Sequence, residues 1–148
     1  MLFRSGLFFG RIANFINGEL PGKVTNVPWG TVFCNDYIRA ANRGICPAGM
    51  EPRHPSQLYE ATLEGIILFL VMQISFRRFR LHDRPGLPTA VFFAGYGIAR
   101  FIAEFFRDSE SKLLGWFSMG MALSIPLWMS AAYFFWASLK KRPWPANA

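Results

Sequence analysis

Three long apolar runs, separated by short polar and basic stretches, dominate the chain. They cover residues 58–76, 87–106 and 113–139. Because a helix needs about 20 mostly apolar residues to cross a bilayer, each run is long enough to span one. A fourth run at 2–20 is interrupted by charges and predicts a short or broken N-terminal helix. The pattern therefore predicts an all-α polytopic membrane protein, with three transmembrane helices plus that N-terminal helix in a single membrane domain over residues 1–148.

The basic residues predict the orientation of these spans. They are concentrated in RRFRLHDR, between the first two runs, and in KKR at 140–142. With three spans both clusters fall on one side of the membrane, which the positive-inside rule makes cytoplasmic. Residues 21–55 and the link at 107–112 then face outward. Residues 1–15 have no long apolar core and no small-residue cleavage site, so we expect no cleavable signal peptide.

Composition supports a membrane protein rather than a soluble one. Hydrophobic residues make up 52% of the 148 positions and include 16 phenylalanines, which a soluble chain of this size would have to bury in one core. A net charge of +7 is compatible with nucleic-acid binding. However, many of the basic residues lie between apolar runs, which favours the cytoplasmic flanks of spans over a nucleic-acid surface.

Two charges lie inside the second apolar run and a third follows its last residue, in YGIARFIAEFFR at 96–107. Arg100, Glu104 and Arg107 have i, i+4 and i+7 spacing and so share one helical face. A charge at mid-bilayer costs at least about 2.5–3.5 kcal/mol, so these side chains need partners, the interface or a wet cavity. Arg107 is near the helix end and can reach the interface, and an Arg100–Glu104 pair can be purely structural. Two arginines sharing one glutamate would instead leave positive charge for an anion such as a phosphate.

A second polar cluster opens the first apolar run, in RHPSQLYEATLEG. Gln57, Glu60 and Glu64 follow one another at helical spacing and share a face. A carboxylate near a helix N-terminus is favoured by the helix dipole, which accounts for Glu60 but poorly for Glu64. His54 and Tyr59 flank this face.

A third polar cluster lies in GRIANFINGEL at 10–20. Arg11 and Asn14 share a helical face, and Asn17-Gly18 is typical of a helix end. Gly6 and Gly10 are four residues apart and permit a close approach of another helix. Hydrogen bonding between helices is the simpler explanation for the asparagines, whereas Arg11 favours a polar pocket. Since all three clusters lie near outward-facing ends, they predict one shared pocket that attracts a lipid phosphate.

Both cysteines, Cys34 and Cys46, fall in the outward stretch. They can pair in an oxidising compartment, or remain as two free thiols. Neither has metal-ligand spacing, and the sequence contains no credible zinc site.

Five motifs, in order, resemble those of the bacterial prolipoprotein diacylglyceryl transferase family. They are GRIANFINGEL, PWG, RHPSQLYEATLEG, GYGIARFIAEFFRD and FSMGMALSIPLW, and they extend over nearly the whole chain. The resemblance implies transfer of a diacylglyceryl group from phosphatidylglycerol to the lipobox cysteine thiol of a preprolipoprotein, with glycerol phosphate as the by-product. It also implies a multi-pass protein of the bacterial inner membrane that uses no metal or organic cofactor. Its partners would be membrane lipid and the preprolipoprotein signal peptide, with no nucleic acid.

The resemblance also implies roles for particular residues. Arg11 and Arg100 would hold the phosphate and stabilise charge on the departing glycerol phosphate, Glu104 would orient an arginine, and His54 or a carboxylate would help to deprotonate the thiol. Asn14 would hydrogen-bond the head group. The other expected substrate-binding residues are Glu19, Arg107, Gln57, Tyr59 and Glu60.

The sequence also departs from the family pattern. Family members are longer, and their additional N-terminal part carries an H-G-G-R-type motif with the catalytic histidine; Met121 replaces a glutamine that tends to follow S-M-G. The chain therefore resembles the C-terminal half of the enzyme, and a separate N-terminal half is a candidate partner. The alternatives are a truncated, non-catalytic membrane fragment or phospholipid-binding partner, and an unrelated channel or transporter piece. A channel would carry charges through the whole membrane depth, whereas these gather near one face.

Overall fold

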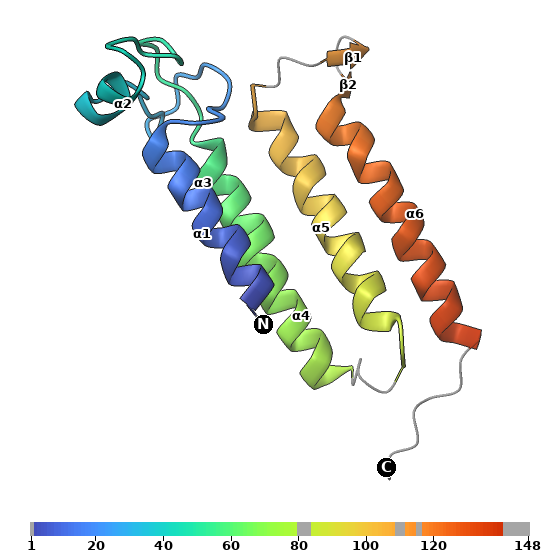
Figure 1. The fold of residues 1–148 in the computed structure, drawn as a ribbon. Helices are drawn as coiled ribbons and strands as arrows, with labels where there is room; N and C mark the ends of the chain where they lie inside the picture. The colour runs from blue at the N-terminus through green and yellow to red at the C-terminus, as the bar shows by residue number, and fades with distance from the viewer. Residues whose placement is uncertain (1, 80–83, 109–111, 115–116, 141–148) are drawn as a thin grey trace.

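The computed structural model describes residues 2–79, 84–108, 112–114 and 117–140. Within these ranges the chain is helical apart from its loops and one small hairpin (Figure 1). The elements in chain order are α1 (Leu2–Asn17), α2 (Asp36–Ala41), α3 (Ser56–Glu60), the π-helix η1 (Ala61–Ile67), α4 (Leu68–Arg78), α5 (Leu87–Phe106), β1 (Lys112–Leu114), β2 (Phe117–Ser118) and α6 (Met119–Lys140).

Three helices are long and apolar enough to cross a membrane. The first is continuous through α3, η1 and α4 over Ser56–Arg78, and the others are α5 and α6. The prediction of an all-α polytopic membrane protein is therefore confirmed. The bounds of α5 agree with the predicted run, and the first span extends two residues beyond its prediction at each end.

The predicted start of the third span at residue 113 was wrong. Lys112 pairs with Ser118 in the antiparallel β1–β2 hairpin, and α6 begins only at Met119. The Ser118 hydroxyl accepts a hydrogen bond from the Met121 backbone N–H at 3.2 Å. A serine that caps the first N–H groups starts a helix, and hydropathy does not register such a cap because the flanking residues are equally apolar.

The N-terminal helix α1 is short and unbroken. It has 16 residues and ends where Gly18 adopts a positive φ of 70°, as Asn17-Gly18 predicted. Gly6 and Gly10 permit a close helix approach, but no atom of the described residues lies within 4 Å of a Cβ placed on either. The close approach instead uses Gly65 of η1, where a Cβ would press on the Phe8 side chain.

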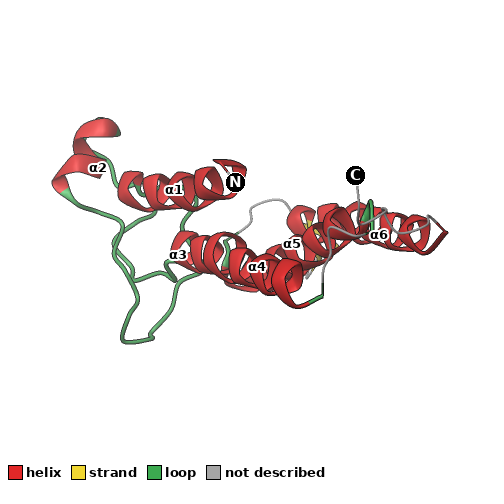
Figure 2. Cartoon of the chain, turned by 90° about the horizontal axis from the view of Figure 1, so that it is seen from below, coloured by secondary structure: helices red, strands yellow, loops and turns green. Residues whose placement is uncertain are grey.

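The long helices run side by side with nearly parallel axes. Helix α1 packs against α3 and η1, and α5 lies between α4 and α6 (Figure 1); Figure 2, from below, shows α3–α4, α5 and α6 in a row with α1 beside α3–α4. The end of α4, the start of α5 and the end of α6 lie at the same end of this layer. The basic side chains Arg77, Arg78, Arg84 and Lys140 therefore share one end, whereas Arg80, Lys141 and Arg142 lie outside the described residues.

Residues 18–55 form a cap at the opposite end of the helices (Figure 1). Phe33, Ile38 and Ala48 form its small buried core and pack against Phe15 of α1. Cys34 and Cys46 form a disulfide across α2, which settles the choice between paired and free thiols. The backbone of Gly22 pairs with that of Arg107, so the cap is attached to the end of α5.

Candidate active site

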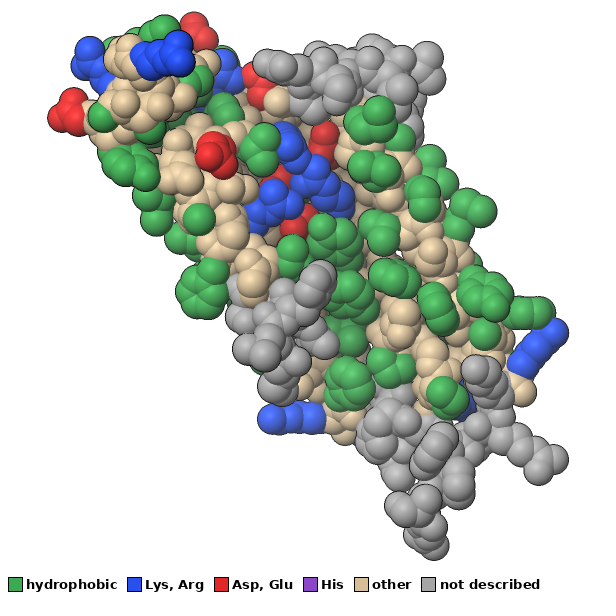
Figure 3. Space-filling model, viewed as in Figure 1, with side chains coloured by type: hydrophobic (Ala, Val, Ile, Leu, Met, Phe, Trp, Pro, Cys, Tyr) green, Lys and Arg blue, Asp and Glu red, His purple; other side chains and the backbone are tan. Residues whose placement is uncertain are grey.

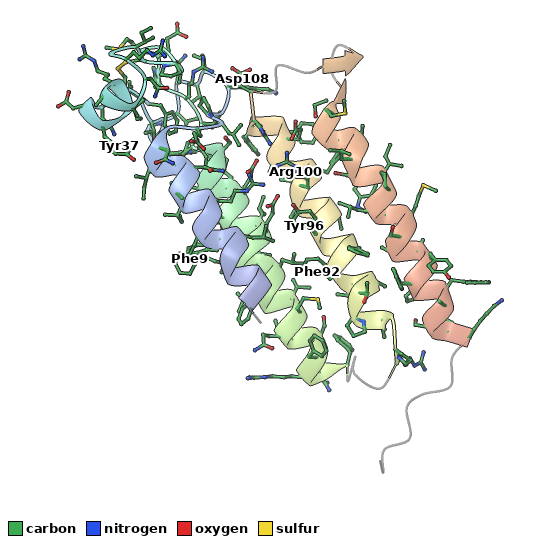
Figure 4. The ribbon with its side chains drawn as sticks, in the orientation of Figure 1. Phe9, Tyr37, Phe92, Tyr96, Arg100 and Asp108 are labelled. Atoms are coloured by element: carbon green, nitrogen blue, oxygen red, sulfur yellow. A yellow bond between two sulfur atoms is a disulfide. The ribbon has the colours of Figure 1, made fainter. Side chains whose placement is uncertain are left out.

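Charged side chains from three helices converge just below the cap. Arg11 comes from α1, Glu60 and Glu64 from α3 and η1, and Arg100 and Glu104 from α5. Figure 4 shows Arg100 on the side of α5 that faces α1 and α3, and Figure 3 shows Lys/Arg and Asp/Glu side chains gathered in one hollow of this face. With Arg107 at the end of α5, these residues are the ion-pair cluster.

Glu60 holds the centre of the ion-pair cluster. Its Oε2 lies 2.8 Å from Arg11 Nη1, and its Oε1 lies 2.9 Å from Arg100 Nη1. Arg107 Nη1 approaches Oε1 at 3.8 Å. One buried carboxylate thus contacts guanidinium groups from two different helices.

The other two carboxylates lie around this centre. Glu64, fully buried, places its Oε2 at 3.4 Å from Arg11 Nη2 and its Oε1 at 4.0 Å from Arg100 Nη1. Glu104 Oε2 lies 3.4 Å from Arg100 Nη2. Arg100 therefore meets all three carboxylates, and Glu104 is positioned to orient it.

The net charge of the ion-pair cluster differs from the sequence-based interpretation. Two arginines sharing one glutamate would have left positive charge. Folding instead brings three arginines and three glutamates together: Arg11, Arg100, Arg107, Glu60, Glu64 and Glu104. The cluster is formally neutral, and this balance makes so many charges tolerable at membrane depth.

A π-helical turn carries the second of the two carboxylates that face Arg11 and Arg100. Glu60 ends α3 and Glu64 lies within η1, where the Leu68 N–H bonds to the Leu63 carbonyl in an i→i+5 pattern. This wider turn changes the rotation per residue relative to an α-helix, and π segments are frequent at functional sites. Nothing in the letters ATLEGII indicates such a turn.

A wall of aromatic rings lies next to the ion-pair cluster. His54, Tyr59 and Phe106 pack edge to face or tilted, with ring centroids 5.2–5.9 Å apart. The Trp29 indole N–H donates to Tyr59 Oη at 2.8 Å, and His54 Nδ1 lies 3.2 Å from the same oxygen. Since an indole only donates, Tyr59 Oη accepts from Trp29, and the histidine tautomer sets whether His54 Nδ1 donates to this oxygen or accepts from it. Within the described residues, the His54 ring has no hydrogen bond to the arginines or glutamates.

Besides Tyr59, three expected substrate-binding residues lie outside the ion-pair cluster. The Asn14 side chain has no hydrogen bond among the described residues, and the Glu19 side chain is exposed. Gln57 is buried and donates through Nε2 to the Glu19 backbone carbonyl, which ties α3 to the end of α1. Its Oε1 has no hydrogen-bond partner in the described part of the chain.

A polar pocket of about 910 Å³ opens between the cap and the helix ends. Arg107 and Glu19 line it, together with Tyr37 and Asn42 of the cap. Arg107 therefore belongs both to this pocket and to the ion-pair cluster. Sequence reasoning did not identify Tyr37 or Asn42, because neither belongs to a motif and the pocket depends on how the cap folds.

Gly120 is a further residue that sequence reasoning missed. A Cβ at this position would overlap the Glu104 carboxylate. The only sequence signal was its place in FSMGMALSIPLW, which gave no indication of its neighbour on α5.

Comparison with known proteins agrees with the motif resemblance. The family model described as prolipoprotein diacylglyceryl transferase matches residues 1–137. The phosphatidylglycerol–prolipoprotein diacylglyceryl transferase of Caulobacter vibrioides (strain NA1000 / CB15N) is 50% identical over 141 residues, which are 92% of this chain and 46% of that protein. The proteins of the same name from Phenylobacterium zucineum and Rhizobium meliloti are 46% and 44% identical over 147 residues, 97% of this chain and 50% and 47% of theirs. The chain thus spans about half the length of the curated relatives it matches.

Proposed function

This chain belongs to the prolipoprotein diacylglyceryl transferase family, and we propose that it carries out, as part of such an enzyme, the transfer that its relatives' name describes. A diacylglyceryl group would pass from phosphatidylglycerol to the lipobox cysteine thiol of a preprolipoprotein. The sulfur forms a bond to the glyceryl carbon as that carbon loses its bond to the phosphate oxygen. The electron pair stays on the departing glycerol phosphate, and the thiol proton is removed.

The observation that carries this proposal is the buried arginine pair. Arg11 and Arg100 come from helices far apart in sequence and meet on one carboxylate at 2.8 and 2.9 Å. Two guanidinium groups held this close provide several N–H donors for phosphate oxygens. Such donors stabilise the charge that develops on the leaving phosphate.

The surrounding residues have supporting roles in this proposal. Glu104 orients Arg100, and Arg107 extends the basic surface toward the pocket below the cap. Asn14 hydrogen-bonds the glycerol head group, and Glu19, Gln57 and Tyr59 contact the substrates. His54, fixed by Tyr59, removes the thiol proton.

The orientation and location complete the proposal. Arg77, Arg78, Arg84 and Lys140 share the end away from the cap, and the positive-inside rule favours the cytoplasm for that end. The cap and the ion-pair cluster then lie near the outer side of the bacterial inner membrane, and the C-terminus is cytoplasmic. A signal peptide carrying its lipobox cysteine would reach the cluster from within the bilayer.

The test is complementation. The chain is expressed in cells depleted of their own diacylglyceryl transferase, alone or with the N-terminal half of a full-length member, and lipidation of a reporter preprolipoprotein is followed by gel shift. We expect lipidation that Arg100→Ala abolishes and that the exposed Arg39→Ala leaves unchanged. Lipidation only with the added half would mean that the transferase needs a second segment.

A non-catalytic phospholipid-binding fragment is the alternative function. The buried arginine pair is sufficient for it, because phosphate binding requires no residue that removes a proton. It predicts that the chain is present in the membrane and binds phosphatidylglycerol, yet lipidates no reporter with or without the added half.

A further inference from the structure

Glu60 occupies the position between the arginines that a bound phosphate would need. Its two oxygens bridge Arg11 and Arg100, and Arg107 lies 3.8 Å from one of them. A carboxylate and a phosphodiester each present two charged oxygens and one negative charge to guanidinium groups, and arginine forms the same forked contacts with both. The two anions therefore compete for the same N–H groups.

The charge balance of the ion-pair cluster makes this competition unavoidable. Three guanidinium groups already face three carboxylates, so a phosphate can pair with them only by competing for N–H groups that a carboxylate holds. The arginines gain a phosphate only when a carboxylate gives up its contacts. Glu64 is fully buried and contacts Arg11 and Arg100 only at 3.4 and 4.0 Å, and the Glu104 carboxylate lies against Gly120. Glu60 is the carboxylate that touches all three arginines.

The direction of access agrees with an exchange. The side chains of Arg11 and Arg100 are 17% and 16% exposed, whereas that of Glu60 is 3% exposed. An anion entering the hollow in Figure 3 meets the guanidinium groups first, with the carboxylates behind them. The exchange then needs the movement of one side chain, not of a helix.

We propose that Glu60 is an internal counter-anion that a phosphodiester displaces on binding and that displaces the phosphate product again after reaction. This inference rests on the proposed function, because it concerns the lipid phosphate of that reaction. It assigns to Glu60 control over how tightly the arginines hold phosphate, in substrate and in product. A product phosphomonoester carries more charge than the diester and would otherwise remain on three arginines.

The test measures phosphate binding to the full chain in detergent, without any transfer reaction. The probes are short-chain phosphatidylglycerol and inorganic phosphate, and titration calorimetry gives the Kd of each. Glu60→Gln removes the competing charge but keeps the size of the side chain. We expect it to bind both probes about tenfold more tightly, in line with one charge-assisted contact. Glu60→Asp has a shorter side chain that reaches the arginines less well, so its Kd should fall between those of the parent chain and Glu60→Gln. Glu51→Gln, on the exposed cap, should bind both probes like the parent chain.

The opposite result would overturn the inference. If Glu60→Gln keeps the parent's melting temperature and binds the probes equally or more weakly, or if no variant binds them, Glu60 only positions the arginines. If Glu60→Gln does not fold, Glu60→Asp decides by the same criterion. Failure of complementation with tighter binding in Glu60→Gln would refute the transferase proposal alone. If the parent chain lipidates the reporter but Glu60→Gln binds the probes no more tightly than the parent, only the exchange is refuted.

Discussion

Gly120 lies directly against the carboxylate of Glu104, and a Cβ at position 120 would overlap that carboxylate. The glycine lets α6 approach α5 at the level of the ion-pair cluster. Because Glu104 contacts Arg100 at 3.4 Å, the identity of a residue on α6 affects the geometry of a charge on α5.

Gly120→Ala should therefore disturb the ion-pair cluster. The added methyl group has to push Glu104 away from Arg100 or separate the two helices, and overpacking of this kind costs about 1–3 kcal/mol. We expect a lower melting temperature in detergent and weaker lipidation in the complementation assay. Gly6→Ala is the matched control, since Gly6 is also helical and no atom in the described part of the chain lies within 4 Å of a Cβ placed there. Equal stability and activity of the two variants would show that α5 and α6 do not pack this tightly.

Arg100→Lys should not substitute for arginine. Arg100 uses Nη1 for Glu60 and Nη2 for Glu104, which belong to different helices. A lysine has a single compact ammonium group and cannot serve both in a forked geometry. We expect the rate of lipidation to fall by about 10²–10³-fold, the usual loss for one electrostatic donor at a reacting centre. Arg39→Lys on the exposed cap provides the control, and a parental rate for Arg100→Lys would refute a forked role.

His54→Phe should separate packing from proton transfer. The new ring can keep the contacts with Tyr59 and Phe106 but lacks the nitrogen that faces Tyr59 Oη at 3.2 Å. If His54 removes the thiol proton, the lipidation rate should fall about 100-fold or more, while the Kd for short-chain phosphatidylglycerol stays the same. A normal rate would place the base elsewhere, and a changed Kd would indicate a binding role.

Cys34→Ser should loosen the cap without affecting the spans. The Cys34–Cys46 bridge joins residues 12 apart and encloses α2, and a bridge of this loop length contributes about 3 kcal/mol. Amide hydrogen exchange should become faster between residues 36 and 48 and remain slow in α5. Reduction of the parent chain should reproduce the change. Equal exchange in both forms would mean that the buried Phe33–Ile38–Ala48 core holds the cap by itself.

The sequence alone determined which segments cross the membrane and where their charges lie. The run at 87–106 became α5 residue for residue, because spanning a bilayer demands an apolar length that hydropathy measures directly. The spacing of Arg100, Glu104 and Arg107 likewise follows from helical geometry. The motifs also identified the family, which the comparison with relatives confirmed.

Only the tertiary structure decided how these charges are partnered. Glu60 lies 49 positions from Arg11 and 40 from Arg100 in the sequence numbering, and their contacts depend on how α1, α3 and α5 pack. For the same reason, sequence analysis gave a positive cluster where the fold makes a neutral one. The start of α6 at Met119 and the contact of Gly120 with Glu104 also escaped prediction, and the sequence left the pairing of the cysteines open. These features depend on the Ser118 cap, on the bond between Cys34 and Cys46, and on the close approach of Gly120 to Glu104. The residues next to each of these positions in the sequence do not reveal the contact.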